Sequence, residues 1–170
     1  MILKRHIEDP EILWLLKQVI SSFRKTDEDI GLPLGNLTSQ LLVNVYMHEF
    51  DMFIKQKLKV KYYIRYADDF IIISDKVEFL ENLLLEIKFF LKDRLKLDLH
   101  KDKVFIKTYA SGVDFLGWVH FPYHRQIRTT TKRKMIRKLS KHSKPQTISS
   151  YRGLLSHGNA YKFQKKLNLL

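Results

Sequence analysis

The sequence predicts an α+β fold, in which a small antiparallel sheet packs on helices and a basic helical module follows. Residues 60–65 and 70–74 are two short β-branched and aromatic runs, and the few residues between them allow only a tight hairpin. Three longer segments place apolar residues at helical spacing. From residue 129 onward, helical spacing coincides with many lysines and arginines. With 45% apolar residues, the 170-residue chain is large enough to bury a core.

The first expected helix begins at Pro10. Residues 9–11 (Asp-Pro-Glu) supply an N-cap residue, a proline at the first helical position and an acid in the first turn. A second helix is expected to begin near residues 38–39, after a glycine- and proline-containing loop at 31–36. A third helix should run from residue 77 to about residue 95, with leucine, isoleucine and phenylalanine on one side.

Shorter elements are expected in the second half of the chain. Residues 104–107 and 115–120 have the composition of short strands, which a turn at 111–112 would join. A basic helix over 132–141 and a last helical stretch over about 148–155 should follow.

The excess positive charge is confined to the C-terminal third of the chain. The net charge is +13, yet residues 1–114 hold 18 Lys/Arg and 18 Asp/Glu, whereas residues 115–170 hold 13 Lys/Arg and no acid. Such a block attracts polyanions and gains affinity by releasing counterions. Aromatic residues are interleaved with it, which favours a folded basic surface over a solvated tail. The basic residues expected to contact nucleic acid are Lys132, Arg133, Lys134, Arg137 and Lys138.

Composition excludes several other classes. No run approaches the ~20 apolar residues of a membrane helix, and the first residues lack the apolar core of a secretory signal. The absence of cysteine excludes disulfides and thiolate metal sites. His120 and His124 are separated by Pro122, so they share no helical face and predict no metal site. We therefore expect a cytoplasmic protein without a membrane partner.

Asp68 and Asp69 lie between the two strands of the expected hairpin. Adjacent carboxylates repel each other and are costly beside an apolar sheet, and a divalent cation relieves both problems. Mg2+ prefers carboxylate, phosphate and water oxygens, and two such ions ~3.5–4 Å apart stabilise both oxygens of a phosphoryl transfer. An ordinary polar turn is the alternative for a bare Asp-Asp pair. The preceding Tyr66 and the apolar residues 70–73 favour two Mg2+ ions, with Mn2+ as a substitute.

The tetrapeptide at 66–69, Tyr-Ala-Asp-Asp, resembles the Tyr-x-Asp-Asp signature of reverse transcriptases, which are RNA-directed DNA polymerases. In that family it lies at the turn of a hairpin in the palm domain. The resemblance implies that Asp68 and Asp69 are catalytic, with Asp68 the main metal ligand and Asp69 the supporting one. It also implies a palm over residues 1–128, a thumb over 129–170, and an RNA template, a DNA or RNA primer and dNTPs as partners.

Residues 31–40, Gly-Leu-Pro-Leu-Gly-Asn-Leu-Thr-Ser-Gln, resemble the family motif that precedes the long palm helix. A glycine lets the backbone approach a base pair or sugar closely, and a helix N-terminus favours phosphate; a plain loop with a helix cap is the alternative. The residues expected to bind nucleotide or template are Gly35, Asn36, Ser39, Gln40 and Tyr66. Group II intron enzymes usually have Gln-Gly and Ser-Pro where this chain has Leu-Gly and Ser-Gln. The motif therefore resembles diversity-generating retroelement enzymes, which implies a small basic accessory protein as a further partner.

Three further blocks follow in the order of the family. Residues 97–104 resemble a palm motif whose lysine lies near the triphosphate and acts as a general acid; Lys103 is the candidate, Lys101 the rival, and a solvated lysine the alternative. Residues 151–159 resemble part of the thumb, which lies on the template–primer duplex. The residues that resemble the primer grip, with a core strand as the alternative, are Phe115, Leu116, Gly117 and Trp118.

The family also uses a metal-binding aspartate from an earlier strand and N-terminal fingers, and neither is evident in this sequence. We therefore expect a truncated palm and thumb. Two hypotheses stay open: an RNA-directed DNA polymerase, and a non-catalytic nucleic-acid-binding remnant of one. A basic structural module, in which Asp-Asp is only a turn, is a remote third.

Overall fold

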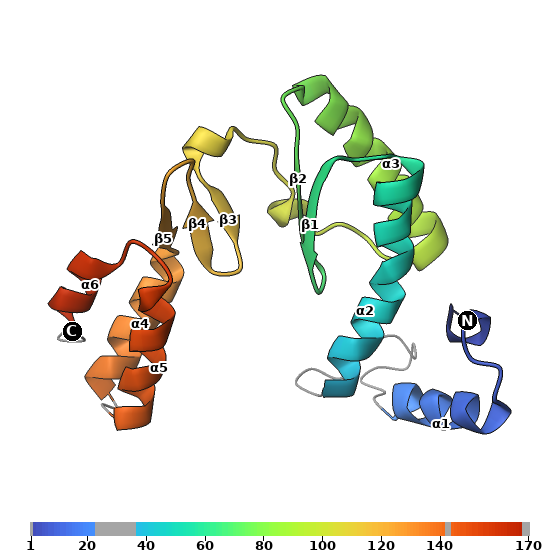
Figure 1. Ribbon diagram of the computed structural model, residues 1–170, viewed down its shortest axis with the longest axis horizontal. Helices are drawn as coiled ribbons and strands as arrows, with labels where there is room; N and C mark the ends of the chain where they lie inside the picture. Colours follow the sequence, from blue (N-terminus) through green and yellow to red (C-terminus); the bar gives the residue numbers. More distant parts are fainter. Residues whose placement is uncertain (1, 23–36, 142–143, 168–170) are drawn as a thin grey trace. The chain divides into compact units, whose positions relative to one another are not determined.

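The computed structural model describes residues 2–22, 37–141 and 144–167 (Figure 1). The chain divides into two compact units, Met1–Val104 (unit 1) and Phe105–Leu170 (unit 2). Helices and small antiparallel sheets make up the described part, which confirms the α+β class. The expected palm–thumb boundary at residues 128/129 stays a prediction.

Unit 1 is mainly helical, with one hairpin. The first helix begins as expected, because the Asp9 carboxylate accepts hydrogen bonds from the backbone N–H of Glu11 (2.8 Å) and of Ile12 (3.2 Å). The third helix has the predicted bounds. The helical elements of unit 1 are η1 (Ile2–Arg5), α1 (Pro10–Ser21), α2 (Leu37–Met52), the π-helical turn η2 (Phe53–Lys57), α3 (Val77–Leu95) and η3 (Lys101–Lys103).

The predicted hairpin is confirmed. Strands β1 (Tyr62–Tyr66) and β2 (Asp69–Ile73) pair antiparallel around a two-residue loop. The π-helical turn η2 brings the chain to this hairpin, because Lys55 Nζ donates to the carbonyls of Val60 (3.0 Å) and Lys61 (3.3 Å) just before β1.

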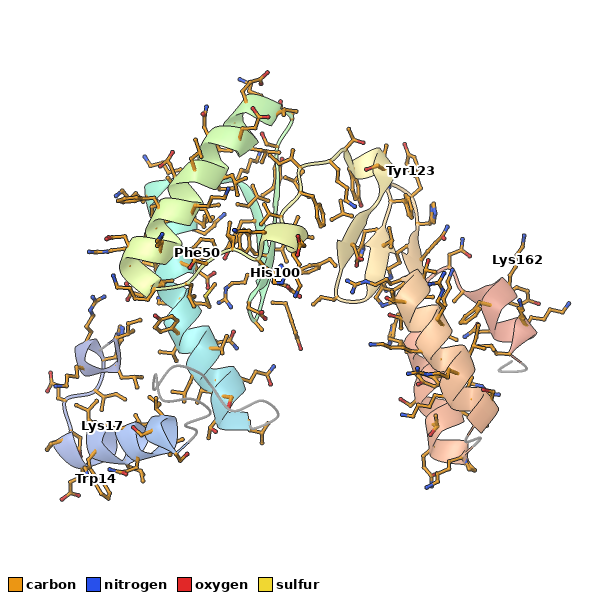
Figure 2. All side chains as sticks on the ribbon, turned by 180° about the vertical axis from the view of Figure 1, so that it is seen from behind. Trp14, Lys17, Phe50, His100, Tyr123 and Lys162 are labelled. Carbon is orange, nitrogen blue, oxygen red and sulfur yellow. The ribbon has the colours of Figure 1, made fainter. Side chains whose placement is uncertain are left out.

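One face of the hairpin covers the core of unit 1. Phe50 of α2 has no exposed surface, and its ring lies 5.0 Å from that of Phe70 and 6.0 Å from that of Tyr63. The ring of Phe50 also lies 6.3 Å from that of Phe90 in α3. Figure 2 labels Phe50 among the side chains of unit 1. Burying one such side chain contributes about 2–3 kcal/mol. The hairpin is therefore held against two helices and not only by its own ladder.

Unit 2 combines a three-stranded antiparallel sheet, in the order β3-β4-β5, with helices. Its core contains Trp118 of the sheet together with Met135 and Leu155 of the helices, all at least 93% buried. The elements of unit 2 are η4 (Tyr109–Ser111), β3 (Val113–Phe115), β4 (Trp118–His120), β5 (Arg125–Ile127), α4 (Thr129–Lys141), α5 (Pro145–Ser156) and α6 (Tyr161–Lys166).

Some expected elements differ from the structure. Residues 104–107 form no strand; they connect η3 to η4. The turn that joins two strands is Leu116-Gly117, not 111–112, and its φ values of 52° and 83° fit a two-residue type I′ hairpin loop. Strand β5 and helix α6 were not predicted.

No helix within the described ranges is long and apolar enough to cross a bilayer. The expected loop at 31–36, with Gly35 and Asn36, lies outside the described residues.

Candidate active site

The two carboxylates expected to bind metal lie at the tip of the β1–β2 hairpin. Asp68 is the second residue of the loop, and Asp69 is the first residue of β2, paired with Tyr66. Both aspartates and Tyr66 are exposed. Because side chains alternate along a strand, Tyr66 and Asp69 share the face opposite the core. The structure thus brings together Tyr66, Asp68 and Asp69.

The loop that carries Asp68 has a strained backbone. Its first residue, Ala67, has a φ of 53°, in the left-handed region that costs a residue with a Cβ about 1 kcal/mol. Nη1 of Arg65 donates a hydrogen bond to the carbonyl of Ala67 at 2.6 Å. A charged side chain of β1 therefore holds the strained residue that immediately precedes Asp68.

The same guanidinium binds helix α2. Arg65 donates from Nε (2.7 Å) and Nη2 (2.5 Å) to the two carboxylate oxygens of Asp51. It also donates from Nη1 to the side-chain oxygen of Asn44 (3.2 Å). Tyr63 donates its hydroxyl hydrogen to Asp51 at 2.6 Å. We call Asn44, Asp51, Tyr63 and Arg65 the Asp51 clamp.

The electrostatics of the clamp keep Asp51 and Arg65 charged. Burial acts to raise the pKa of Asp51, but the hydrogen bonds from Arg65 and Tyr63 outweigh it and hold this pKa below the ordinary value. The hydrogen bonds to Asp51 raise the pKa of Arg65 against the effect of burial. Burial, and then the hydrogen bond to Asp51, raise the pKa of Tyr63 well above its usual range. The clamp is thus a charge-assisted network with a neutral tyrosine.

Sequence reasoning missed the clamp, although a signal was present. Side chains alternate along β1, so Tyr63 and Arg65 both point to its core-facing side. The guanidinium of Arg65 therefore lies on the buried face of an apolar hairpin. Such a cation requires a nearby acid. Asp51, on the helix that precedes the hairpin, meets this requirement.

The two carboxylates at the hairpin tip fit a hard divalent cation. Mg2+ is usually held by one or two carboxylates, with phosphate and water oxygens completing its shell. Asp68 and Asp69 supply two exposed carboxylates on a fixed backbone. In the part of the chain that the structure describes, no group of three or more acids and histidines could hold a metal. The two aspartates therefore form a partial donor set.

The other expected site residues of unit 1 lie on different elements. Ser39 and Gln40 are in the first turn of α2; Gln40 is exposed, whereas Ser39 is 93% buried and its hydroxyl has no hydrogen-bond partner among the described residues. Ser39 and Asp51 lie twelve positions apart in α2, about 18 Å along the helix axis. Lys103, like Lys101, is exposed in η3. Their roles stay predictions.

The residues that resemble the primer grip surround the β3–β4 turn of unit 2. Trp118 is 93% buried in the core, while Leu116 at the turn is exposed. Arg128 donates its backbone N–H to the carbonyl of Gly117 (3.0 Å) and its Nε to Asp114 (2.8 Å). The core-strand alternative therefore describes the side chain of Trp118 well.

Most of the basic residues of α4 are exposed. Met135 is 99% buried, and Lys132 is half-buried, with Nζ 5.9 Å from the ring centre of Phe163. The other four residues expected to contact nucleic acid are exposed, and they form two pairs spaced i, i+4, so that they lie on one surface of the helix. They are Arg133, Lys134, Arg137 and Lys138. We call these four the α4 basic stripe.

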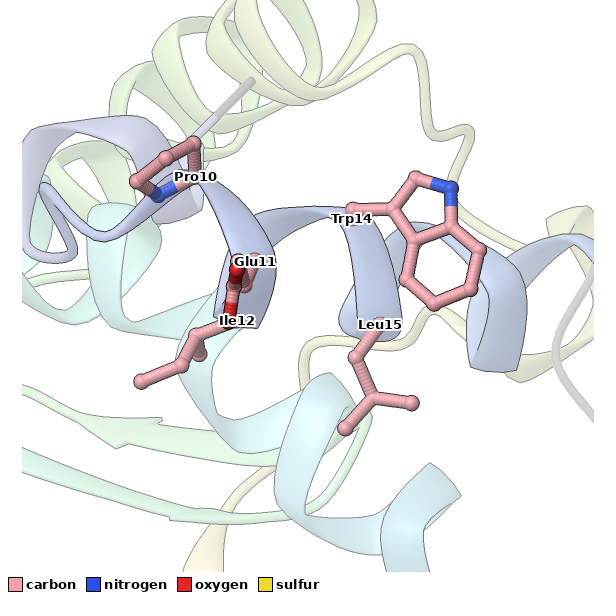
Figure 3. Close-up of a pocket in the computed structure, with 5 residues that line it drawn as sticks. All are labelled: Pro10, Glu11, Ile12, Trp14 and Leu15. Carbon is pink, nitrogen blue, oxygen red and sulfur yellow. The ribbon is translucent and has the colours of Figure 1, made fainter.

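A hollow at the start of α1 lacks the paired carboxylates that a metal site needs. Figure 3 shows that one helix supplies its walls, with Trp14 and Leu15 side by side. Trp14 is 63% and Leu15 57% exposed. The hollow contains a single acid, Glu11, so the hairpin tip remains the candidate site.

Comparisons with known proteins identify a family for this chain. The family described as reverse transcriptase (RNA-dependent DNA polymerase) matches residues 6–120, more than half of the chain. The COX1/OXI3 intron 2 protein of Saccharomyces cerevisiae is 39% identical over 64 residues, which cover 37% of this chain and 8% of that protein. Protein YkfC of Escherichia coli is 28% identical over an alignment of 169 positions, which covers 76% of this chain and 42% of YkfC. The chain spans less than half the length of these curated relatives.

Proposed function

This chain belongs to the reverse transcriptase family, and we propose that it supplies the catalytic carboxylates of an RNA-directed DNA polymerase. The observation that carries the proposal is the position of Asp68 and Asp69 at the tip of a hairpin whose backbone is fixed by a buried core and by the Asp51 clamp. A two-residue loop between paired strands fixes the directions of its side chains, which a metal site requires.

The proposed roles rest on the family resemblance, together with the position of the side chains on the hairpin. Asp68 is the main metal ligand and Asp69 the supporting ligand for two Mg2+ ions, which Mn2+ replaces. Bound Mg2+ supplies charge neutralisation at the attacking and leaving oxygens of nucleotidyl transfer. Tyr66 is proposed to contact a nucleotide, and its exposed position on the same hairpin face as Asp69 supports this role. Lys103 donates a proton to the leaving diphosphate.

Unit 2 is proposed to hold the template–primer duplex. Residues 105–170 contain 14 Lys/Arg and one acid, Asp114, which is paired with Arg128. The α4 basic stripe therefore faces solvent without a competing carboxylate from its own unit. The proposed partners are an RNA template, a DNA or RNA primer, dNTPs and, for a diversity-generating retroelement enzyme, a small basic accessory protein.

A second candidate function is a non-catalytic protein that binds an RNA–DNA duplex. It is favoured by the donor set, because the described residues supply only two carboxylates at the hairpin tip. It uses the α4 basic stripe in the same way but assigns no metal to Asp68.

Primer extension on an RNA template with Mg2+ tests the proposal. Asp68→Ala should lower the extension rate by ~100-fold or more, the usual loss when a transition-state stabiliser is removed. Asp93→Ala is the matched control, since Asp93 is an exposed acid of α3 in the same unit.

Each other outcome has a clear meaning. Extension by Asp68→Ala at the rate of the unchanged protein would contradict the proposed function. If the unchanged protein does not extend the primer but binds an RNA–DNA duplex in a salt-sensitive way that Asp68→Ala leaves unaltered, the second candidate is correct.

A further inference from the structure

One side chain connects the hairpin loop to helix α2. Arg65 contacts Asp51 and Asn44 of α2 and, from the same guanidinium, the carbonyl of Ala67 in the loop. Its side chain is only 11% exposed. The guanidinium is planar and its N–H groups point at fixed angles. The hydrogen bonds to Asp51 and Asn44 therefore determine the position of Nη1, which donates to the carbonyl of Ala67.

The anchor of this connection, Asp51, is attached to the core of unit 1. Asp51 directly follows Phe50, which has no exposed surface. Movement of Asp51 would therefore disturb the core of unit 1. Helix α2 thus fixes the position of the Ala67 carbonyl through Arg65. Because the backbone nitrogen of Asp68 is bonded to that carbonyl carbon, the position of Asp68 is fixed with it.

Two members of the clamp differ in what they contact. Tyr63 reaches Asp51 but not the loop, whereas Arg65 reaches both. A purely structural role of the clamp would make both residues matter for stability alone. A positioning role would make only Arg65 matter for the geometry of Asp68.

Building on the function proposed above, we infer that Arg65 is the positioning residue of the metal-binding loop, which fixes the Asp68 carboxylate by linking the Ala67 carbonyl to Asp51 and Asn44. It touches neither metal nor substrate in this role. A lysine at this position keeps the charge, but one ammonium group cannot reproduce the fork that spans Asp51, Asn44 and the loop.

The test is an NMR titration of the 170-residue chain with Mn2+, which broadens amide signals close to a bound ion. Arg65→Lys should raise the Mn2+ concentration for half-maximal broadening of the Asp68 amide about 10-fold, the lower end for partners of metal ligands. It should also lower the heteronuclear NOE of that amide, which reports order of the loop. Tyr63→Phe, which removes one clamp contact but leaves Arg65 to Ala67 intact, should leave both readouts unchanged.

Two further variants complete the design. Arg5→Lys is the matched control, because Arg5 makes an exposed ion pair with Glu49 of the same helix α2 at 3.0 Å and lacks a contact with the loop among the described residues. If Arg65→Lys fails to fold by circular dichroism, Asp51→Asn replaces it. That variant keeps Arg65 and removes the charge of its anchor, so it should also weaken Mn2+ binding.

The outcomes separate this inference from the proposed function. Unchanged Mn2+ binding and unchanged loop order in Arg65→Lys and Asp51→Asn would overturn the positioning role while leaving metal binding intact. If the unchanged protein shows no Mn2+ effect at Asp68, the proposed metal role fails, and loop order alone then decides. A looser loop in Arg65→Lys but not in Tyr63→Phe supports the positioning role even then.

Discussion

The β1–β2 hairpin of unit 1 and the β3–β4 hairpin of unit 2 both close with a two-residue loop whose first residue is not glycine. The φ values of these residues, Ala67 and Leu116, are 53° and 52°. The second residues differ: Asp68 in unit 1, and Gly117, with a φ of 83°, in unit 2. The first loop presents a carboxylate, whereas the second presents only backbone and Leu116.

An arginine holds each loop, but by different atoms. In unit 1 the guanidinium of Arg65 reaches the loop carbonyl and is anchored on a helix through Asp51. In unit 2 the backbone N–H of Arg128 donates to Gly117, and its guanidinium pairs with Asp114 of β3, the first strand of the hairpin. The difference teaches that the loop carrying Asp68 is held by an arginine of its own hairpin, which is anchored on a helix. The other loop is held by a residue that follows β5 and by an apolar anchor, Trp118.

The packing of Trp118 in unit 2 should be the feature whose disruption costs the most stability, and one added methyl group is enough to disrupt it. A Cβ at Gly158 would lie 2.0 Å from Cζ3 of Trp118, so Gly158→Ala should destabilise unit 2 by about 3 kcal/mol. Gly153→Ala, in α5 with no atom within 4 Å of the added Cβ, should instead stabilise it by about 0.5–1 kcal/mol. Thermal unfolding followed by Trp118 fluorescence, in a Trp14→Phe background, measures both. Equal stability of the two variants would contradict the packing role of Gly158.

The two arginine–aspartate pairs should differ in strength. The side chains of Arg65 and Asp51 are 11% and 28% exposed, against 41% and 30% for Arg128 and Asp114. Asp51→Ala should therefore cost about 2 kcal/mol, because it leaves a mostly buried cation unpaired. Asp114→Ala should cost less than about 1 kcal/mol. Urea unfolding followed by amide signals of each unit gives both values, and a larger loss for Asp114→Ala would refute the contrast.

Acid should produce the smallest effect, in unit 1. The pKa of Asp51 in the folded chain is below its ordinary value of 3.8, so the clamp contributes its full stability above that pH and loses it as pH falls through the lower folded value. The unfolding free energy of unit 1 should decline below about pH 3.8, and Asp51→Asn should flatten this decline. Urea titrations at successive pH values measure it. An identical decline in Asp51→Asn would show that other groups cause the acid sensitivity.

Local signals predicted much of the fold and the placement of the hairpin carboxylates. The Asp9 cap, the apolar spacing over 77–95 and the β-branched runs on either side of the loop each act within a few residues along the chain. Asp68 and Asp69 followed from the same hairpin. Their chemical roles, like that of Lys103, rest on the family resemblance and stay predictions.

The elements that sequence reasoning missed depend on neighbours in space. Strand β5 is mostly polar, and it forms because Ile127 pairs with Trp118 of β4. Residues 104–106 are apolar and include two β-branched side chains, yet residues 104–107 pair with no strand within the described residues and stay irregular. The Asp51–Arg65 pair joins residues 14 positions apart across a helix and a hairpin, a distance that local patterns do not specify.

Each strand of this protein pairs only with its neighbour in sequence, within the described residues. Closing such short loops is fast, and hairpins form within ~1–10 μs, so low contact order favours rapid folding. The β1–β2 register should therefore be set while the chain still lacks a packed core, before Asp51 meets Arg65. Folding would then present the pair of carboxylates first and fix their direction last.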